Sequence, residues 1–226
     1  VEAADLDDAV EQGYAWLSRP EWFCCRRPRP VSVDSGTTGI EVRPSPPRWL
    51  SSRTVPDNSK VFENLLDHPS VVRVRTALSE GGVETMVVIL DEHARTAAAA
   101  AEQLGVTVAQ IANSLIFALP AVDGAEPEPL LVMTSGEHRV DPVKVADLIG
   151  VERLDRADAD FVRDRTGFAI GGVAPIGHLR GVRTLVDVSL SQHAQIWAAA
   201  GHPRSVFCTS YDQLLRLTGG TPVEVV

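Results

Sequence analysis

Residues 166–177 read Thr-Gly-Phe-Ala-Ile-Gly-Gly-Val-Ala-Pro-Ile-Gly. Four glycines and one proline surround small apolar residues, none of which is an acid, a base or a nucleophile. A glycine pair allows left-handed backbone and lets a ligand approach main-chain N–H groups closely, and the proline that follows stiffens the exit. Such a loop can hold a small polar ligand or a developing oxyanion with backbone donors alone, although the same glycines also fit a simple tight turn.

Further sequence blocks surround this loop in a fixed order. One block lies upstream of the loop, at 111–117, and reads Ile-Ala-Asn-Ser-Leu-Ile-Phe. Three blocks lie downstream: Thr-Leu-Val-Asp at 184–187, Ala-Gly at 200–201 and Asp-Gln-Leu-Leu-Arg-Leu-Thr-Gly at 212–219. In this order and spacing the run resembles the YbaK/ProX family of aminoacyl-tRNA deacylases, which is related to the editing domain inserted in bacterial prolyl-tRNA synthetases. The resemblance covers about residues 69–226, and its most specific part, Gly171 to Pro175, is similar to the family's G-x-x-x-P loop.

Composition indicates a globular protein of a reducing cytoplasm. The 226 residues are 44% hydrophobic and 23% charged, without an apolar run long enough for a membrane span or a recognisable secretory signal. Two of the three cysteines, Cys24 and Cys25, are adjacent, which makes a poor disulfide framework, and Cys208 in its apolar run is predicted to be a buried, inert thiol. The spacing of Cys and His offers no zinc pattern, so no metal and no cofactor are expected.

The net charge limits the possible partners. The chain carries −9 at pH 7, and residues 60–226 hold 21 Asp and Glu against 14 Lys and Arg. Affinity for phosphate backbones comes from clustered Lys and Arg, so DNA is not expected as a partner. A tRNA would be held weakly at its acceptor end, or presented by another protein such as an aminoacyl-tRNA synthetase.

Two regions differ in composition. Residues 1–59 hold seven of the fifteen prolines and, beyond a short helix at 6–17, show no sustained period, which predicts a disordered or linker-like N-terminal extension. Residues 60–226 form the predicted YbaK-like aminoacyl-tRNA deacylase domain. Helices are predicted at 71–78 after a Ser70 cap, from Thr96 to Gly105, and at 108–112, 141–149, 158–165 and 210–219. Strands are predicted at 84–90, 114–119, 130–133, 184–188, 196–199 and 206–209.

Helices come mostly early, strands mostly late, and no βαβ repeat is visible. This order favours an α+β fold with a curved mixed β-sheet, barrel-like and with surrounding helices, and the resemblance implies the same YbaK-like fold.

The sequence lacks the familiar catalytic motifs: it has no nucleophile elbow, HExxH or Walker motif. A mechanism would therefore rest on a positioned water and backbone electrostatics, which suits an already activated aminoacyl ester. The resemblance implies that the loop binds the aminoacyl group, with main-chain groups supplied by Gly171, Gly172, Val173 and Ala174 while Pro175 fixes the loop.

Asn113 is a departure from the family pattern. The resemblance places here a lysine that contacts the phosphate of the terminal adenosine, whereas asparagine brings no charge. Asn113 could orient water or a ribose hydroxyl, or it could be a strand-start cap or turn residue. Ser114 matches the adjacent polar position.

Three more residues have two possible roles. Asp187 matches a family acidic position that could hold an amino group or order the loop, and it could also be a solvated strand terminus. His138 faces the cleft or lies on a surface turn, and Thr166 caps the loop entry or binds ligand. His178 and His202 are interpreted as ordinary loop histidines.

The function expected from the sequence is a trans-editing hydrolase that deacylates a mischarged aminoacyl-tRNA of the tRNA-Pro type. The alternatives are a catalytically weak or inactive YbaK-like binding module for an aminoacyl or small-molecule ligand, and a deacylase for another small aminoacyl ester. The expected catalytic residues are Asn113, Gly171 and Gly172. The expected substrate-binding residues are Ser114, His138, Thr166, Val173, Ala174, Pro175 and Asp187.

Overall fold

The computed structural model describes residues 65–121 and 125–226. Several predictions lie outside this part and stay predictions. They are the N-terminal extension at 1–59 with its short helix, the start of the domain at residue 60, and the absence of a disulfide framework at Cys24 and Cys25.

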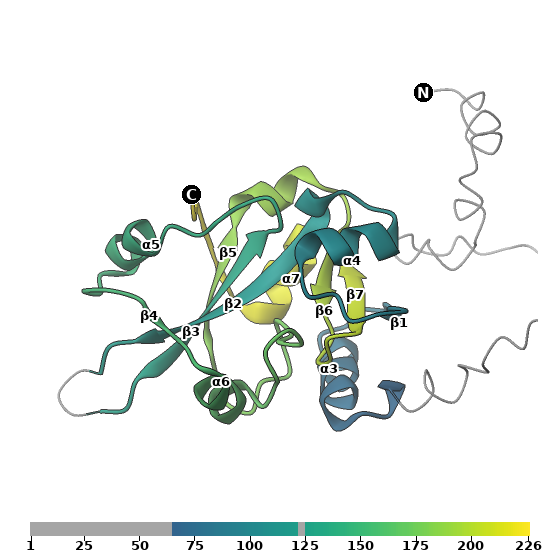
Figure 1. Cartoon of the computed structure of the whole chain (residues 1–226), viewed down its shortest axis with the longest axis horizontal. Helices are drawn as coiled ribbons and strands as arrows, with labels where there is room; N and C mark the ends of the chain where they lie inside the picture. The colour runs from purple at the N-terminus through teal and green to yellow at the C-terminus, as the bar shows by residue number, and fades with distance from the viewer. Residues whose placement is uncertain (1–64, 122–124) are drawn as a thin grey trace, which may run out of the picture.

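A mixed sheet of eight strands runs through the described residues (Figure 1). Its order is β1-β7-β6-β2-β3-β5-β8, with β4 paired to β2. The strands are β1 (Val87–Ile89), β2 (Ile111–Leu119), β3 (Glu128–Ser135), β4 (Asp155–Arg156), β5 (Arg183–Asp187), β6 (Ile196–Ala199), β7 (Ser205–Thr209) and β8 (Thr221–Val223). The β2–β6, β3–β5 and β5–β8 pairs are parallel and the other pairs antiparallel, so the predicted mixed sheet is confirmed.

Helices cover both faces of the sheet. They are α3 (Pro69–Glu80), α4 (Ala97–Leu104), α5 (Pro142–Ile149), α6 (Ala159–Thr166) and α7 (Tyr211–Thr218), with 3-10 turns η4 (Val108–Gln110) and η5 (Val188–Gln192). Figure 1 shows α4 and α5 above the sheet and α3 and α6 below it. Alternating side chains of β7 divide between the layers: Phe207 joins the core with α3, α6 and α7, whereas Val206 and Cys208 pack with α4. Cys208 is 1% exposed, so its predicted burial is confirmed.

Most helix ends follow the predicted caps. The Thr96 hydroxyl accepts from Ala99 N–H, and Ser210 and Gln213 form a reciprocal capping box at the start of α7. The predicted Ser70 cap is wrong. α3 begins at Pro69, because proline suits the first helical position, and the cap is the His68 ring, whose Nδ1 accepts from Ser70 N–H at 3.3 Å.

Several predicted elements have different bounds in the structure. The strand expected at 84–90 is only the three residues of β1, and the helix expected at 108–112 is the short turn η4. β2 starts at Ile111 instead of Ser114, because Ile111 and Ala112 pair with β6. Asn113 therefore lies inside a strand, and its interpretation as a cap or turn residue is wrong.

Candidate functional site

A cavity opens where two parallel strands separate. β2 and β6 pair at Ile111 with Trp197 and at Ala112 with Ala198, and no further pair of residues joins them. The cavity at this fork has a volume of about 330 Å³ and is bounded by the start of α4, the glycine loop at 167–177 and the turn between β6 and β7. Ligand sites of α/β sheets often lie where neighbouring strands diverge, because the strand ends leave a crevice.

Asn113 is the first residue of β2 beyond the fork, and it lines the cavity with Ser114. Its backbone position pairs with Thr134 of β3, while its half-buried side-chain amide has no hydrogen-bond partner among the described residues. The Ser114 hydroxyl donates to Met133 Sδ at 3.3 Å. The Asn113 amide is therefore a free donor and acceptor at the cavity wall.

The glycine loop supplies backbone donors, but not all those expected. Gly172 N–H donates to Ala169 O at 3.0 Å, so the expectation that Gly172 offers a catalytic donor is wrong: its amide closes a turn. Gly171, with φ of +86°, and Val173 both line the cavity. Their N–H groups have no acceptor within the part of the chain that the structure describes. These two amides remain as candidate oxyanion donors.

The next two loop residues take different positions. Ala174 is fully buried, and its carbonyl accepts from His178 Nε2 at 2.8 Å. Pro175 lines a second cavity on the other side of the loop. Of the main-chain groups expected at 171–174, those of Gly171 and Val173 line the cavity, whereas those of Gly172 and Ala174 form hydrogen bonds within the loop.

Gly172 is required by packing against the turn between β6 and β7. A Cβ at this position would lie 2.9 Å from the His202 backbone, closer than real Cβ contacts. The two loops therefore interlock, and this contact places the His202 side chain in the cavity wall.

His202 is more than the ordinary loop histidine expected from the sequence. Its Nδ1 accepts from Arg204 N–H at 3.1 Å, so the neutral ring carries its proton on Nε2 and presents a donor. Burial lowers the pKa of His202, and neighbouring His68 and His93 lower the pKa further, which favours this neutral form. The Ala-Gly block just before it was the sequence signal that could have identified it.

Arg73 of α3 holds both ends of the glycine loop. Its Nη2 donates to Gly167 O at 2.8 Å and its Nε to Gly177 O at 3.3 Å. The guanidinium carbon lies 4.9 Å from the centre of the Phe168 ring, within cation–π range. The loop is thus preorganised by a residue that sequence reasoning missed.

Thr166 and His178 are structural. The Thr166 hydroxyl is buried, donates to Val162 O at 2.6 Å and accepts from Phe168 N–H at 3.1 Å, which is the loop-capping role and not ligand binding. Burial lowers the pKa of His178, whose neutral Nε2–H bonds the Ala174 carbonyl. Both fix the path of the loop, so the interpretation of His178 as a loop histidine agrees with its contacts.

Asp187 is 1% exposed, so its interpretation as a solvated strand terminus is wrong. One carboxylate oxygen accepts from the Thr134 hydroxyl at 3.2 Å and from Ser135 N–H at 3.3 Å, and it lies 2.7 Å from His138 Nδ1. The other accepts from Ser189 N–H at 3.0 Å. Burial by itself would raise the pKa of Asp187, but hydrogen bonds from Ser189, His138 and Ser135 outweigh burial and lower it.

The paired Asp187 and His138 do not line the cavity. Their contacts join the end of β3 to η5, so the expected substrate-binding role of both is corrected to a structural one. The separation of 49 positions between them gave no local signal for the pairing.

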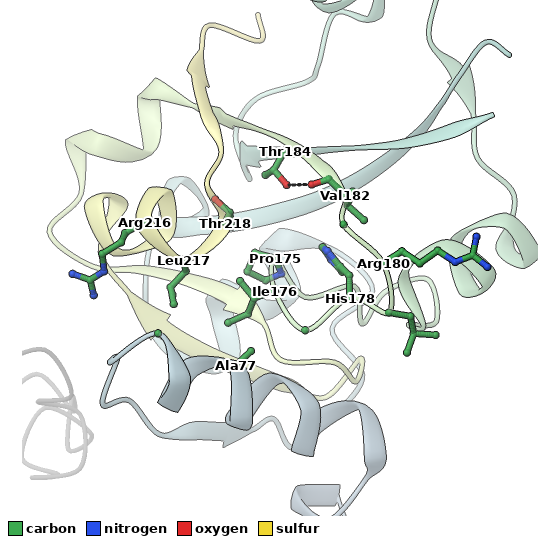
Figure 2. A pocket seen from close by; sticks show the side chains of 14 residues that line it. Ala77, Pro175, Ile176, His178, Arg180, Val182, Thr184, Arg216, Leu217 and Thr218 are labelled. Atoms are coloured by element: carbon green, nitrogen blue, oxygen red, sulfur yellow. Dashed lines mark hydrogen bonds between the residues drawn. The ribbon is translucent and has the colours of Figure 1, made fainter. Parts of the chain in front are cut away.

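The second cavity is larger, about 600 Å³, and lies between residues 175–182, α3 and the end of α7 (Figure 2). The Thr184 and Thr218 hydroxyls in its wall donate to backbone carbonyls at 3.1 and 2.8 Å. Figure 2 shows the guanidinium groups of Arg180 and Arg216 pointing away from one another on opposite sides. The smaller cavity brings the unpartnered N–H groups of Gly171 and Val173 together with the Asn113 amide, and it is therefore the candidate active site.

The sequence profile of the aminoacyl-tRNA editing domain matches residues 91–217, more than half of the chain. The chain belongs to the aminoacyl-tRNA editing domain family. The uncharacterized protein YwhH of Bacillus subtilis is 29% identical over 136 residues, which cover 60% of this chain and 83% of YwhH. A proline–tRNA ligase of Limosilactobacillus fermentum is 35% identical over 102 residues, 45% of this chain but only 17% of the ligase.

Solved structures agree with this family assignment. A crystal structure of a proposed trans-editing enzyme for prolyl-tRNA synthetase is 38% identical, with a TM-score of 0.62 over 70% of this chain and 96% of that one. A scaffold from computational epitope grafting is 36% identical, with a TM-score of 0.63 over 70% of this chain and 97% of that one. The predicted YbaK-like α+β fold is confirmed. Across residues 65–121 and 125–226, no helix is long and apolar enough to cross a membrane.

Proposed function

We propose that this chain deacylates a mischarged aminoacyl-tRNA in trans, with the aminoacylated acceptor end in the cavity at the fork of β2 and β6. The observation that carries the proposal is the pair of unpartnered N–H groups on Gly171 and Val173, which line the same cavity as the free Asn113 amide. Val173 is only 5% exposed, whereas Gly171 is exposed to solvent. A buried residue whose N–H has no acceptor is rare in folded proteins, so Val173 favours a ligand oxygen at this place, and the neighbouring Gly171 N–H can donate to the same oxygen.

The reaction needs no nucleophilic side chain. The oxygen of a water forms a bond to the ester carbonyl carbon, and the bond from that carbon to the ribose oxygen breaks. One proton of the water goes to the ribose oxygen, and the other is lost when the released carboxylic acid ionises. The N–H groups of Gly171 and Val173 stabilise the oxyanion, while Asn113 orients the water or a ribose hydroxyl.

A small aminoacyl group attached to a tRNA of the tRNA-Pro type is the proposed substrate. Supporting this, relatives of the chain include segments of proline–tRNA ligases and a proposed trans-editing enzyme for prolyl-tRNA synthetase. The cavity volume of about 330 Å³ is at the small end of the range for ligand pockets, which favours a small aminoacyl group.

The test is a deacylation assay with a panel of mischarged tRNAs. We expect turnover of a tRNA-Pro carrying a small amino acid, and we expect Asn113→Ala to lower kcat/KM about tenfold, since one polar contact is lost. Gln192→Ala, an exposed amide on η5, is the matched control and leaves the rate unchanged. Protection by an aminoacyl-adenosine analogue without turnover of any tRNA would instead favour the alternative, an inactive binding module.

A further inference from the structure

The basic side chains near the cavity differ in how they are engaged. Arg73 holds the glycine loop, and Arg204 Nε donates to Leu90 O at 2.9 Å. Arg95 also lines the cavity, and its exposed side chain makes no ion pair or hydrogen bond with any described residue. Arg95 is therefore the available cation at the cavity wall.

The backbone on both sides of Arg95 is anchored. Ala94 N–H donates to Pro203 O at 3.4 Å, and Leu90 N–H donates to Arg204 O at 2.7 Å, so the segment before α4 is tied to the turn between β6 and β7. Thr96 then caps α4, whose first residue Ala97 also lines the cavity. A guanidinium on this fixed backbone lies beside the positive end of a helix, an environment that favours an anion.

The proposed substrate brings an anion to this place. Its ester is joined to a terminal nucleotide whose phosphodiester lies one ribose away, while residues 60–226 hold 21 acids against 14 basic residues. A phosphate near so acidic a domain needs a local cation, and Asn113 has no charge.

We propose that Arg95 binds the phosphodiester of the 3′-terminal nucleotide of the tRNA and so positions the ester at the glycine loop. The proposal rests on the proposed function. The planar guanidinium can donate two parallel hydrogen bonds to phosphate oxygens, which fixes orientation as well as supplying charge. Arg95 acts as a positioning residue and takes no part in the bond changes.

The test compares one mischarged tRNA with the matching aminoacyl-adenosine, which has the ester but no phosphate. We expect Arg95→Gln to raise KM for the tRNA about tenfold with little change in kcat, and to reduce the slope of log KM against log salt by about 0.7. With aminoacyl-adenosine this difference disappears. Arg95→Lys keeps the charge, so its KM for the tRNA stays close to that of the wild type. Arg216→Gln, at the other cavity, is the matched control.

A second variant tests position directly. Asn113 and Arg95 line one cavity, so adding Asn113→Lys to Arg95→Gln restores the low KM for the tRNA. Equal loss on both substrates, an unchanged KM, or the same loss in Arg216→Gln would overturn the proposal. If the wild type hydrolyses neither substrate, the proposed function fails. The role of Arg95 is then tested by comparing the binding of adenosine 5′-monophosphate with that of adenosine. If the wild type binds the monophosphate more tightly and Arg95→Gln loses this difference, Arg95 binds phosphate. If the wild type binds both equally, the proposal for Arg95 is overturned.

Discussion

Replacement of Arg73 by methionine tests whether one side chain holds the glycine loop. The variant keeps an apolar stem but loses the bonds of 2.8 and 3.3 Å to Gly167 and Gly177 and the cation over Phe168. Hydrogen bonds from charged donors contribute about 1.5–3 kcal/mol, and exposed cation–π contacts about 0.5–1 kcal/mol. We assign about 2 kcal/mol to the short hydrogen bond, about 0.5 kcal/mol to the long one and about 0.5 kcal/mol to the cation–π contact with Phe168. The free energy of unfolding is therefore expected to fall by about 3 kcal/mol.

In a domain of this size about 1 kcal/mol shifts Tm by roughly 2–4 °C, so Arg73→Met lowers Tm by roughly 6–12 °C. Hydrogen exchange at 167–177 accelerates, and deacylation falls because its donors are no longer preorganised. Arg75→Met, an exposed position on the same helix, is the control and changes Tm by less than about 2 °C. If both variants had the same Tm, and exchange at 167–177 were unchanged, Arg73 would not hold the loop.

Two more predictions follow from the loop packing. Gly172→Ala places a methyl group 2.9 Å from the His202 backbone and lowers both Tm and the deacylation rate. The control is Gly181→Ala, whose added Cβ has nothing within 4 Å and which changes neither quantity. Equal Tm values for the two variants would refute the close packing of Gly172 against the His202 backbone. Burial lowers the pKa of His178 below that of the unfolded chain, so this histidine contributes stability fully above about pH 6.5, and the contribution is lost as pH falls below that value. Tm measured from pH 8 to 5 therefore falls less steeply in His178→Gln than in the wild type, and parallel curves would contradict this.

Local signals in the sequence predicted the helix ends well. A cap involves residues within about four positions of each other, so Thr96 and the Ser210–Gln213 box could be recognised without the fold. β6 has its predicted bounds because its apolar residues are buried on both faces. β4 and β8, with two and three residues, are too short to show a period and were missed.

The candidate site was only partly predictable, because its supports are distant in the sequence. Arg73 reaches loop carbonyls 94 and 104 positions away, and no local pattern marks that contact. His202 was missed for the same reason, since its place depends on the packing of its turn against Gly172. Asp187 was expected to bind substrate, but its hydrogen bonds to Thr134, Ser135 and Ser189 use it inside the fold. Sequence patterns identified residues of the right chemistry, and tertiary packing decided which of them reach the cavity.

The interlocked loops give the proposed editing reaction a physical basis for selectivity. The glycine loop is fixed by Arg73 on one side and by the His202 backbone on the other, so two walls of the cavity have little freedom to move apart. A cavity with fixed walls cannot expand for a larger side chain without breaking these contacts, so extra methylenes meet overpacking costs of about 1–3 kcal/mol. Each such cost corresponds to roughly 10- to 200-fold discrimination. An acidic domain that holds tRNA weakly would therefore select its substrate mainly by the size of the aminoacyl group and not by affinity for the nucleic acid.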